Sequence, residues 1–141
     1  MTTSIGPGHE ASTKARHMNT FAKEALGGLV LIGRMMALPG KREELLELLE
    51  EAVALCGEHE TDGALTAIFH TSPAKSDIVV LYEHYPSRVS LEEHRANYER
   101  IPAYGQMRAR MNGLLALPVE IVEVATPAVR FTRAASPERE E

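Results

Sequence analysis

Residues 29–56 decide the fold and read LVLIGRMMALPGKREELLELLEEAVALC. The apolar run at 29–37 carries a single charge, Arg34, and is stopped by the Pro-Gly pair at 39–40, a pattern that predicts a strand followed by a turn. From Lys41 onward apolar residues recur at helical spacing and glutamates fill the remaining positions, which predicts an amphipathic helix. A strand and a long helix therefore open the folded part of the chain.

The downstream segments complete a regular order of elements. Two stretches rich in β-favouring residues are separated by a short polar loop, and a helical segment that breaks at Pro102 and Gly105 leads to a last strand. In chain order these are residues 64–70 and 78–82 as strands, 87–100 and 107–115 as helices, and a strand from 119. The order β, α, β, β, α, β predicts an α+β fold of the ferredoxin-like type, with a four-stranded antiparallel sheet.

The two ends of the chain differ in composition from its middle. They mix Gly, Ser, Thr, Pro and charged residues and lack the apolar content that ordering a segment requires. We therefore expect a flexible N-terminal arm at 1–27, a folded domain at 28–126 and a solvated C-terminal tail at 127–141, in which Val129 and Phe131 are the residues able to dock. The total of 141 residues, 44% of them hydrophobic, fits one globular domain.

Charge and cysteine content exclude several classes of function. Fifteen Lys and Arg against 20 Asp and Glu give a net charge of -5, the wrong sign for binding nucleic acid. The longest uncharged apolar stretch, 25–33, is shorter than the roughly 20 residues of a membrane span, and no secretory signal precedes it. We expect a cytoplasmic protein without nucleic-acid or membrane partners. The single cysteine, Cys56, excludes an internal disulfide, and no spacing of His and Cys indicates a metal site.

Both faces of the expected sheet are apolar. The third strand carries Ile78 and Val80 on one face and Val79 and Leu81 on the other, and the first strand repeats this pattern. The helices of a ferredoxin-like fold cover only one face. We therefore expect a homodimer whose sheets face each other, with an apolar cavity between sheet and helices. The alternative is that one end of the same chain covers the free face.

Three motifs, taken together, resemble a known family. They are Leu-Pro-Gly-Lys at 38–41 before the acidic helix, Asp-Gly at 62–63, and Leu-Tyr-Glu-His-Tyr at 81–85 followed by Leu91 and His94. Their order and spacing are similar to those of the antibiotic biosynthesis monooxygenase domain, a dimeric α+β barrel family, over about residues 29–124. The resemblance implies oxygenation of phenolic or quinol substrates by O₂ without metal, flavin or another cofactor.

Oxygenation without a cofactor requires an electron-rich substrate, a base, a partner for an oxyanion and a dry pocket. His94 matches the family's histidine on the second helix and is the first candidate for the base or for a substrate anchor. Its alternative role is to position this segment by a hydrogen bond. Tyr85, as a donor to an oxyanion, and Arg34, as a cation beside a phenolate, are the other catalytic candidates. Arg34 can equally pair with Glu83.

The candidate substrate-binding residues are Glu83, Tyr98, Asn97, Met35 and Met111. Glu83 matches the family's strand glutamate, although a structural pairing explains it better. Tyr82 and His84 lie on the opposite strand face from Glu83 and Tyr85, and we expect the second pair to face the cavity. Tyr85 stands where many family members carry tryptophan. This chain contains no tryptophan, which counts against the haem degradation found in one branch of the family.

Two other functions stay open from the sequence alone. One is a dimeric module that binds a small apolar ligand without catalysis. The other is an isomerase or decarboxylase that uses the same base without O₂. Ferredoxin-like dimers host many unrelated functions, so the fold does not choose among these.

Overall fold

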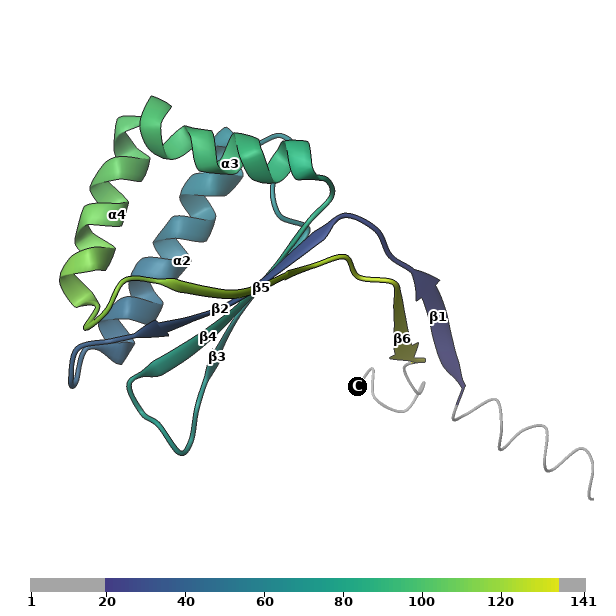
Figure 1. Ribbon diagram of the computed structural model, residues 1–141, viewed down its shortest axis with the longest axis horizontal. Coiled ribbons are helices and arrows are strands. Elements are labelled where there is room, and N and C mark those ends of the chain that lie inside the picture. Colours follow the sequence, from purple (N-terminus) through teal and green to yellow (C-terminus); the bar gives the residue numbers. More distant parts are fainter. Residues whose placement is uncertain (1–19, 135–141) are drawn as a thin grey trace, which may run out of the picture. The chain divides into compact units, whose positions relative to one another are not determined.

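The computed structural model describes residues 20–134. Residues 27–127 form one compact unit, and residues 20–26 and 128–134 belong to a second (Figure 1). Within the described residues, no helix is both long enough and apolar enough to cross a membrane.

The larger unit has the predicted order of elements. They are β2 (Leu29–Met36), α2 (Arg42–His59), β3 (Thr66–Thr71), β4 (Ile78–Tyr85), α3 (Arg88–Arg100), α4 (Pro102–Leu114) and β5 (Glu120–Ala125). The four strands form one antiparallel sheet in the order β3-β4-β2-β5. All three helices lie on the same side of this sheet (Figure 1). The ferredoxin-like α+β fold expected from the sequence is therefore confirmed.

The turn between β2 and α2 depends on a glycine. Gly40 has a φ of 75°, a left-handed conformation that residues with a side chain rarely adopt. Beyond this turn, α2 buries the apolar stripe predicted from the sequence and leaves its glutamates in solvent. The buried members of the stripe are Leu45, Leu48, Leu49 and Ala52.

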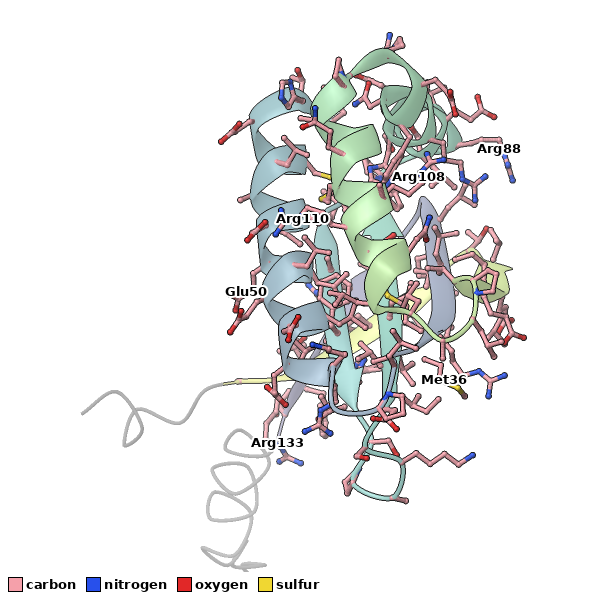
Figure 2. The ribbon with its side chains drawn as sticks, turned by 90° about the vertical axis from the view of Figure 1, so that its left-hand side faces the viewer. Met36, Glu50, Arg88, Arg108, Arg110 and Arg133 are labelled. Carbon is pink, nitrogen blue, oxygen red and sulfur yellow. The ribbon has the colours of Figure 1, made fainter. Side chains whose placement is uncertain are left out.

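The second helical region is divided one residue before the expected position. The break falls at Ile101, and α4 begins with Pro102 at its first position. Proline is favoured there because a helix makes no use of the first N–H groups. Gly105 lies inside α4 and does not break it. Helices α2 and α4 lie side by side (Figures 1 and 2), and Arg110 of α4 is paired with Glu51 of α2 at 2.7 Å.

The core fills the space between the sheet and the helices. Its largest cluster of buried side chains includes Leu31, Met35, Leu45, Leu49, Val79, Leu81, Tyr85 and Leu91. The residues of β2 and β4 in this cluster are odd-numbered, so the even-numbered residues face away from the helices. Ile32, Tyr82 and Ile68 lie directly opposite one another on that helix-free face, and Ile68 is 44% exposed. Met36 (Figure 2), at the end of β2, is 39% exposed.

The smaller unit is a strand pair that the sequence analysis did not predict. β1 (Phe21–Ala25) and β6 (Val129–Arg133) form a two-stranded antiparallel sheet in which every residue is exposed. Two cross-strand pairs stabilise this sheet. The guanidinium of Arg130 donates a hydrogen bond to the carboxylate of Glu24, and the guanidinium carbon of Arg133 lies 4.5 Å from the ring centre of Phe21. Composition does not report pairing between distant exposed segments. Residues 1–19 and 135–141 of the expected arm and tail lie outside the described residues.

Candidate functional site

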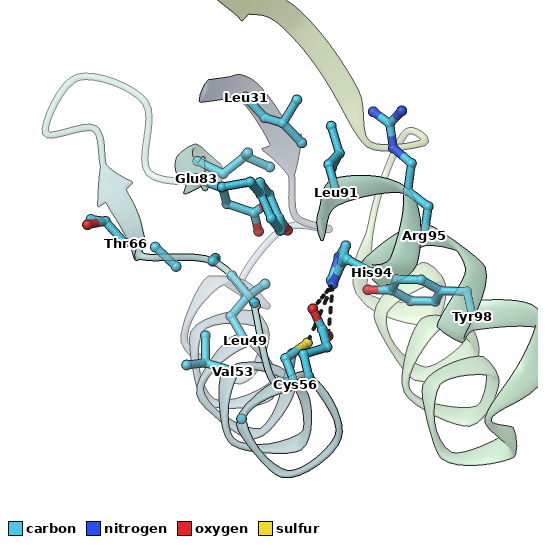
Figure 3. A pocket seen from close by; sticks show the side chains of 18 of the residues that line it. Leu31, Leu49, Val53, Cys56, Thr66, Glu83, Leu91, His94, Arg95 and Tyr98 are labelled. Carbon is cyan, nitrogen blue, oxygen red and sulfur yellow. Dashed lines mark hydrogen bonds and ion pairs between the residues drawn. The ribbon is translucent and has the colours of Figure 1, made fainter. Parts of the chain in front are cut away.

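A pocket of about 930 Å³ lies between the sheet and the helices (Figure 3). Its volume is typical of small-molecule sites. Its apolar wall includes Leu31, Met35, Leu49, Leu81, Leu91 and Met111, and its polar groups include Cys56, Glu60, Glu83, Tyr85, His94 and Tyr98. The cavity expected between sheet and helices is therefore present in the single chain.

His94 is the polar side chain around which the others gather. It lies in α3, and its Nδ1 atom is 3.1 Å from both carboxylate oxygens of Glu60, the residue that ends α2. An ionised carboxylate only accepts hydrogen bonds, so Nδ1 carries the hydrogen and Nε2 carries the lone pair of the neutral ring. Nε2 has no hydrogen-bond partner within residues 20–134, and His94 lines the pocket. The ring can therefore accept a proton from a molecule in the pocket.

Glu60 is buried and held by several donors. Its side chain is 3% exposed, and the hydroxyl of Tyr104 donates to Oε2 at 2.5 Å. Burial alone raises the pKa of this carboxyl, but hydrogen bonds from Tyr104, His94 and Cys56 outweigh burial and lower it. Glu60 therefore stays ionised, fixes the orientation of the imidazole and stabilises its protonated form.

The sequence analysis missed both Glu60 and Tyr104. Glu60 stands in a Glu-Thr-Asp-Gly turn, a composition typical of solvent-exposed loops. Thirty-four residues separate it from His94, and 44 separate it from Tyr104. No local spacing reports such contacts, which arise where α2 ends beside α3 and α4.

Tyr85 and Glu83 form the opposite wall of the site. Both line the pocket, as expected for this face of β4, and the Tyr85 hydroxyl donates to Glu83 Oε2 at 3.1 Å. The ring centre of Tyr85 is 5.5 Å from that of His94. Burial, followed by the charge of Glu83, raises the pKa of Tyr85 far above its usual value. The residue therefore remains a neutral hydrogen-bond donor.

Three more aromatic and apolar predictions reach the pocket. Tyr98, Met35 and Met111 all line it. Tyr98 meets the His94 ring edge to face, with ring centres 5.4 Å apart, and the guanidinium carbon of Arg108 lies 4.3 Å from its ring centre. Burial, together with the nearby Cys56 and Glu83, raises the pKa of Tyr98 to about 12.

Arg34 and Asn97 are not among the residues that line the pocket, so the structure does not bring these two candidates to the site. Arg34 lies on the helix-free face of β2 and is paired with Glu120 at 3.2 Å, not with Glu83. Side chains alternate along a strand, so Arg34 points away from the face that Met35 shares with the pocket. Asn97 is 1% exposed and accepts a hydrogen bond from Arg100 at 2.5 Å, which makes it a buried structural residue of α3.

Cys56 adds a third ligand type beside His94 and Glu60. Its Sγ atom lies 3.8 Å from Nδ1 of His94, and one ligating atom from each of the three residues lies within 4.8 Å of the others. The sequence analysis expected no metal site, because Cys56 has no His or Cys at a ligand spacing. Burial raises the pKa of Cys56 to about 12, so its thiol stays protonated when no cation is bound.

Comparison with known proteins gives a consistent family. The family model described as antibiotic biosynthesis monooxygenase matches residues 28–110. Rv0793 of Mycobacterium tuberculosis, which is named as a candidate monooxygenase, is 32% identical to this chain over 97 residues. The matched residues are 69% of this chain and 89% of that protein. The solved structure of Rv0793 has a TM-score of 0.56 and covers 70% of this chain and 93% of its own.

A more distant structure shares the fold. It comes from Caulobacter crescentus, is 13% identical with a TM-score of 0.54, and covers 87% of this chain and 99% of its own. The segment that the family model matches contains His94 and the polar residues described around it, which are Cys56, Glu60, Tyr85 and Tyr104. This chain belongs to the antibiotic biosynthesis monooxygenase family.

Proposed function

We propose that the protein is a cofactor-independent monooxygenase that oxidises a small phenolic or quinol-type aromatic with O₂. Family membership supports the class of reaction. The observation that carries the proposal is the state of one imidazole: Glu60 holds its Nδ1–H, and the ring belongs to the wall of a largely apolar pocket. This arrangement supplies a base beside an apolar wall.

The reaction begins with proton transfer from the substrate hydroxyl to Nε2 of His94. The ionised Glu60 stabilises the imidazolium that forms. The electron-rich substrate anion then reduces O₂, and a carbon–oxygen bond forms, which gives a substrate peroxide. His94 then returns its proton to the outer peroxide oxygen. The carbon that bears the peroxide loses its hydrogen as a proton, the C–H electron pair forms the C=O bond, and the O–O bond breaks to release hydroxide, which takes up that proton and leaves as water. The substrate supplies all the electrons that reduce O₂, so the reaction needs no added reductant.

The aromatic wall suits such a substrate. Tyr85 and Tyr98 flank His94, with ring centres at 5.5 and 5.4 Å, and both stay neutral because their pKa values are raised. Apolar residues complete the wall. We assign the tyrosine rings to packing against the substrate ring, where stacked and edge-on contacts stabilise aromatic pairs by about 0.5–1.5 kcal/mol.

The proposal includes a homodimer built through the helix-free face of the sheet. The row formed by Ile32, Tyr82 and Ile68 presents apolar surface there. A second copy of the same face covers this row by two-fold symmetry. The cytoplasmic location expected from the sequence stays a prediction.

Oxygen consumption tests the activity. The full chain is supplied with a panel of quinols and anthrone-like phenols in an O₂ electrode, and ¹⁸O₂ labelling should place one labelled atom in the product. His94→Gln should lower kcat by about 10²–10⁴-fold, the range typical of general-base catalysis. His70→Gln, which removes an exposed imidazole of β3 outside the pocket wall, is the matched control and should retain activity.

Other outcomes favour the alternatives or remove the assignment. Uptake that is unchanged in His94→Gln excludes His94 as the base. Turnover that continues without O₂ identifies an isomerase or decarboxylase. Saturable quenching of tyrosine fluorescence by a substrate that is never converted identifies a binding module.

A further inference from the structure

Three side chains with three different ligand chemistries converge at the pocket wall. They are the thiol of Cys56, the carboxylate of Glu60 and the Nδ1 atom of His94. Figure 3 shows Cys56 and His94 pointing toward each other across the site. We propose that this cluster binds a thiophilic divalent cation of the Zn²⁺ class. The proposal rests on the positions of these ligand atoms, and the oxygenase reaction does not require it.

The distances between the ligand atoms suit a tetrahedral cation. Zinc bonds of about 2.3 Å to sulfur and about 2.0–2.1 Å to nitrogen or oxygen, at tetrahedral angles, place N and O about 3.4 Å apart and S and N about 3.6 Å apart. The corresponding distances are 3.1 Å between Nδ1 and Oε1 and 3.8 Å between Sγ and Nδ1. These two distances therefore require shifts of only a few tenths of an ångström, and the third, between Sγ and a carboxylate oxygen of Glu60, is within 4.8 Å.

The backbone and the second layer of contacts hold the ligands in place. Cys56 and Glu60 are four residues apart at the end of α2, a spacing that puts both side chains on one side of the helix. Tyr104 donates to the carboxylate of Glu60 at 2.5 Å, which is the kind of contact that orients a metal-bound carboxylate. Three protein ligands leave the fourth position of a tetrahedral ion open, and all three residues line the pocket.

The donor set also selects the cation. One thiolate and one imidazole favour Zn²⁺, Co²⁺ and similar ions, whereas Mg²⁺ and Ca²⁺ require mostly oxygen ligands. Glu60 is buried and already ionised, so it offers a negative charge without further cost.

Binding changes the protons of the cluster. Cys56 releases its thiol proton to solvent, and the hydrogen on Nδ1 of His94 is replaced by the cation. A neutral imidazole bound through Nδ1 carries its hydrogen on Nε2, so that atom donates and no longer accepts. If the proposed function holds, occupancy therefore inhibits O₂ consumption, and removal of the cation by a chelator restores it.

Cobalt spectroscopy on the full chain tests the site. The chain contains one cysteine, so a thiolate-to-cobalt charge-transfer band reports on Cys56 alone. The protein is treated with a chelator, kept reduced with a phosphine in place of a thiol, and titrated with Co²⁺. We expect this band together with the intense visible bands of a tetrahedral ion, saturating at one Co²⁺ per chain and bleached by an equivalent of Zn²⁺.

Variants locate the other ligands. Glu60→Gln should weaken Co²⁺ binding by at least about tenfold, whereas Glu58→Gln, which removes an exposed charge from the same helix, should not. Absence of the charge-transfer band in the wild-type protein overturns the proposal even if every variant misfolds. Cobalt binding that persists unchanged in Cys56→Ser also overturns it, because the ion is then bound elsewhere. Oxygen uptake by the metal-free protein is scored separately, so failure of one proposal is distinguishable from failure of the other.

Discussion

The Nδ1 atom of His94 lies 3.1 Å from both carboxylate oxygens of Glu60, two residues separated by 34 positions in the chain. The carboxylate is buried, accepts a further hydrogen bond from Tyr104 and has a lowered pKa. The pair therefore sets which nitrogen of the ring is free to react. It gives a histidine that matches a family position a defined orientation and a defined hydrogen on Nδ1.

Replacing Glu60 by glutamine tests this relationship. The amide keeps the size of the side chain but loses the charge that stabilises the imidazolium, so kcat should fall by roughly 10²–10⁴-fold while KM changes little. Steady-state O₂ uptake measures both parameters. Glu58→Gln makes the same charge change at an exposed position of α2, outside the pocket wall, and should leave both parameters unaltered. An equal fall in kcat in both variants would contradict a specific role for Glu60, because any lost charge on the helix would then have the same effect.

High pH should weaken the fold through its tyrosines. Burial is the largest cause of the raised pKa values of Tyr85, Tyr98 and Tyr104, and the value for Tyr98 rises from 10.0 to about 12. Between these limits the unfolded chain loses protons that the native state retains, so stability is complete below pH 10 and falls as pH rises toward 12. Urea unfolding just below pH 10 and close to pH 12 measures the loss. Tyr98→Phe should reduce this loss of stability. A free energy of unfolding that does not change between the two pH values would contradict the prediction that buried tyrosines cause the loss.

A charge on the helix-free face should separate the proposed dimer. Ile68 is 44% exposed and lies opposite Tyr82 in the apolar row, so Ile68→Glu places an unpaired carboxylate in the interface. Light scattering should give twice the mass of the chain for the wild type and close to one chain for this variant. Val89→Glu is the control, since Val89 is 72% exposed on α3. A monomeric wild type at micromolar concentration would falsify the dimer.

Two glycine substitutions should have opposite effects on stability. Gly28 has a φ of 87°, and a Cβ built there lies 2.0 Å from the carbonyl oxygen of Tyr85, so Gly28→Ala should destabilise the fold by more than about 1 kcal/mol. Gly57 lies inside α2, and a Cβ built there meets no atom within 4 Å. Gly57→Ala should therefore stabilise by about 0.5–1 kcal/mol. Thermal or urea unfolding measures the stability of both variants. Destabilisation by both would contradict the prediction that Gly57, unlike Gly28, tolerates a side chain.

The register of the sheet explains which site predictions reached the pocket. Alternation along β4 was sufficient to place Glu83 and Tyr85 on one face, and the pocket lies on that face. Arg34 shares its face of β2 with Ile32, whereas the helices cover the face of Leu31 and Met35. The prediction for Arg34 considered its charge and not its position in this alternation. Asn97 is likewise outside the pocket wall, since it is buried within the fold and does not line the pocket.

The strand pair at the chain ends shows the limit of composition. β1 and β6 are exposed along their whole length, so no apolar periodicity in the sequence predicts them. Their order comes from backbone pairing between segments about a hundred residues apart, as in the pair of Glu24 with Arg130. A sequence pattern reports burial within one segment and does not report which distant segment will pair with it.

Local periodicity in the sequence determined the elements, their order and the ferredoxin-like sheet, because hydrophobic spacing along β2, α2 and β4 is a property of neighbouring residues. A resemblance in short motifs was enough to single out His94. Only the tertiary structure brought Cys56, Glu60 and Tyr104 to that ring, because their contacts span 34 to 44 residues and depend on how the end of α2 packs against α3 and α4. The chemistry of the site follows from that packing, which no local pattern encodes.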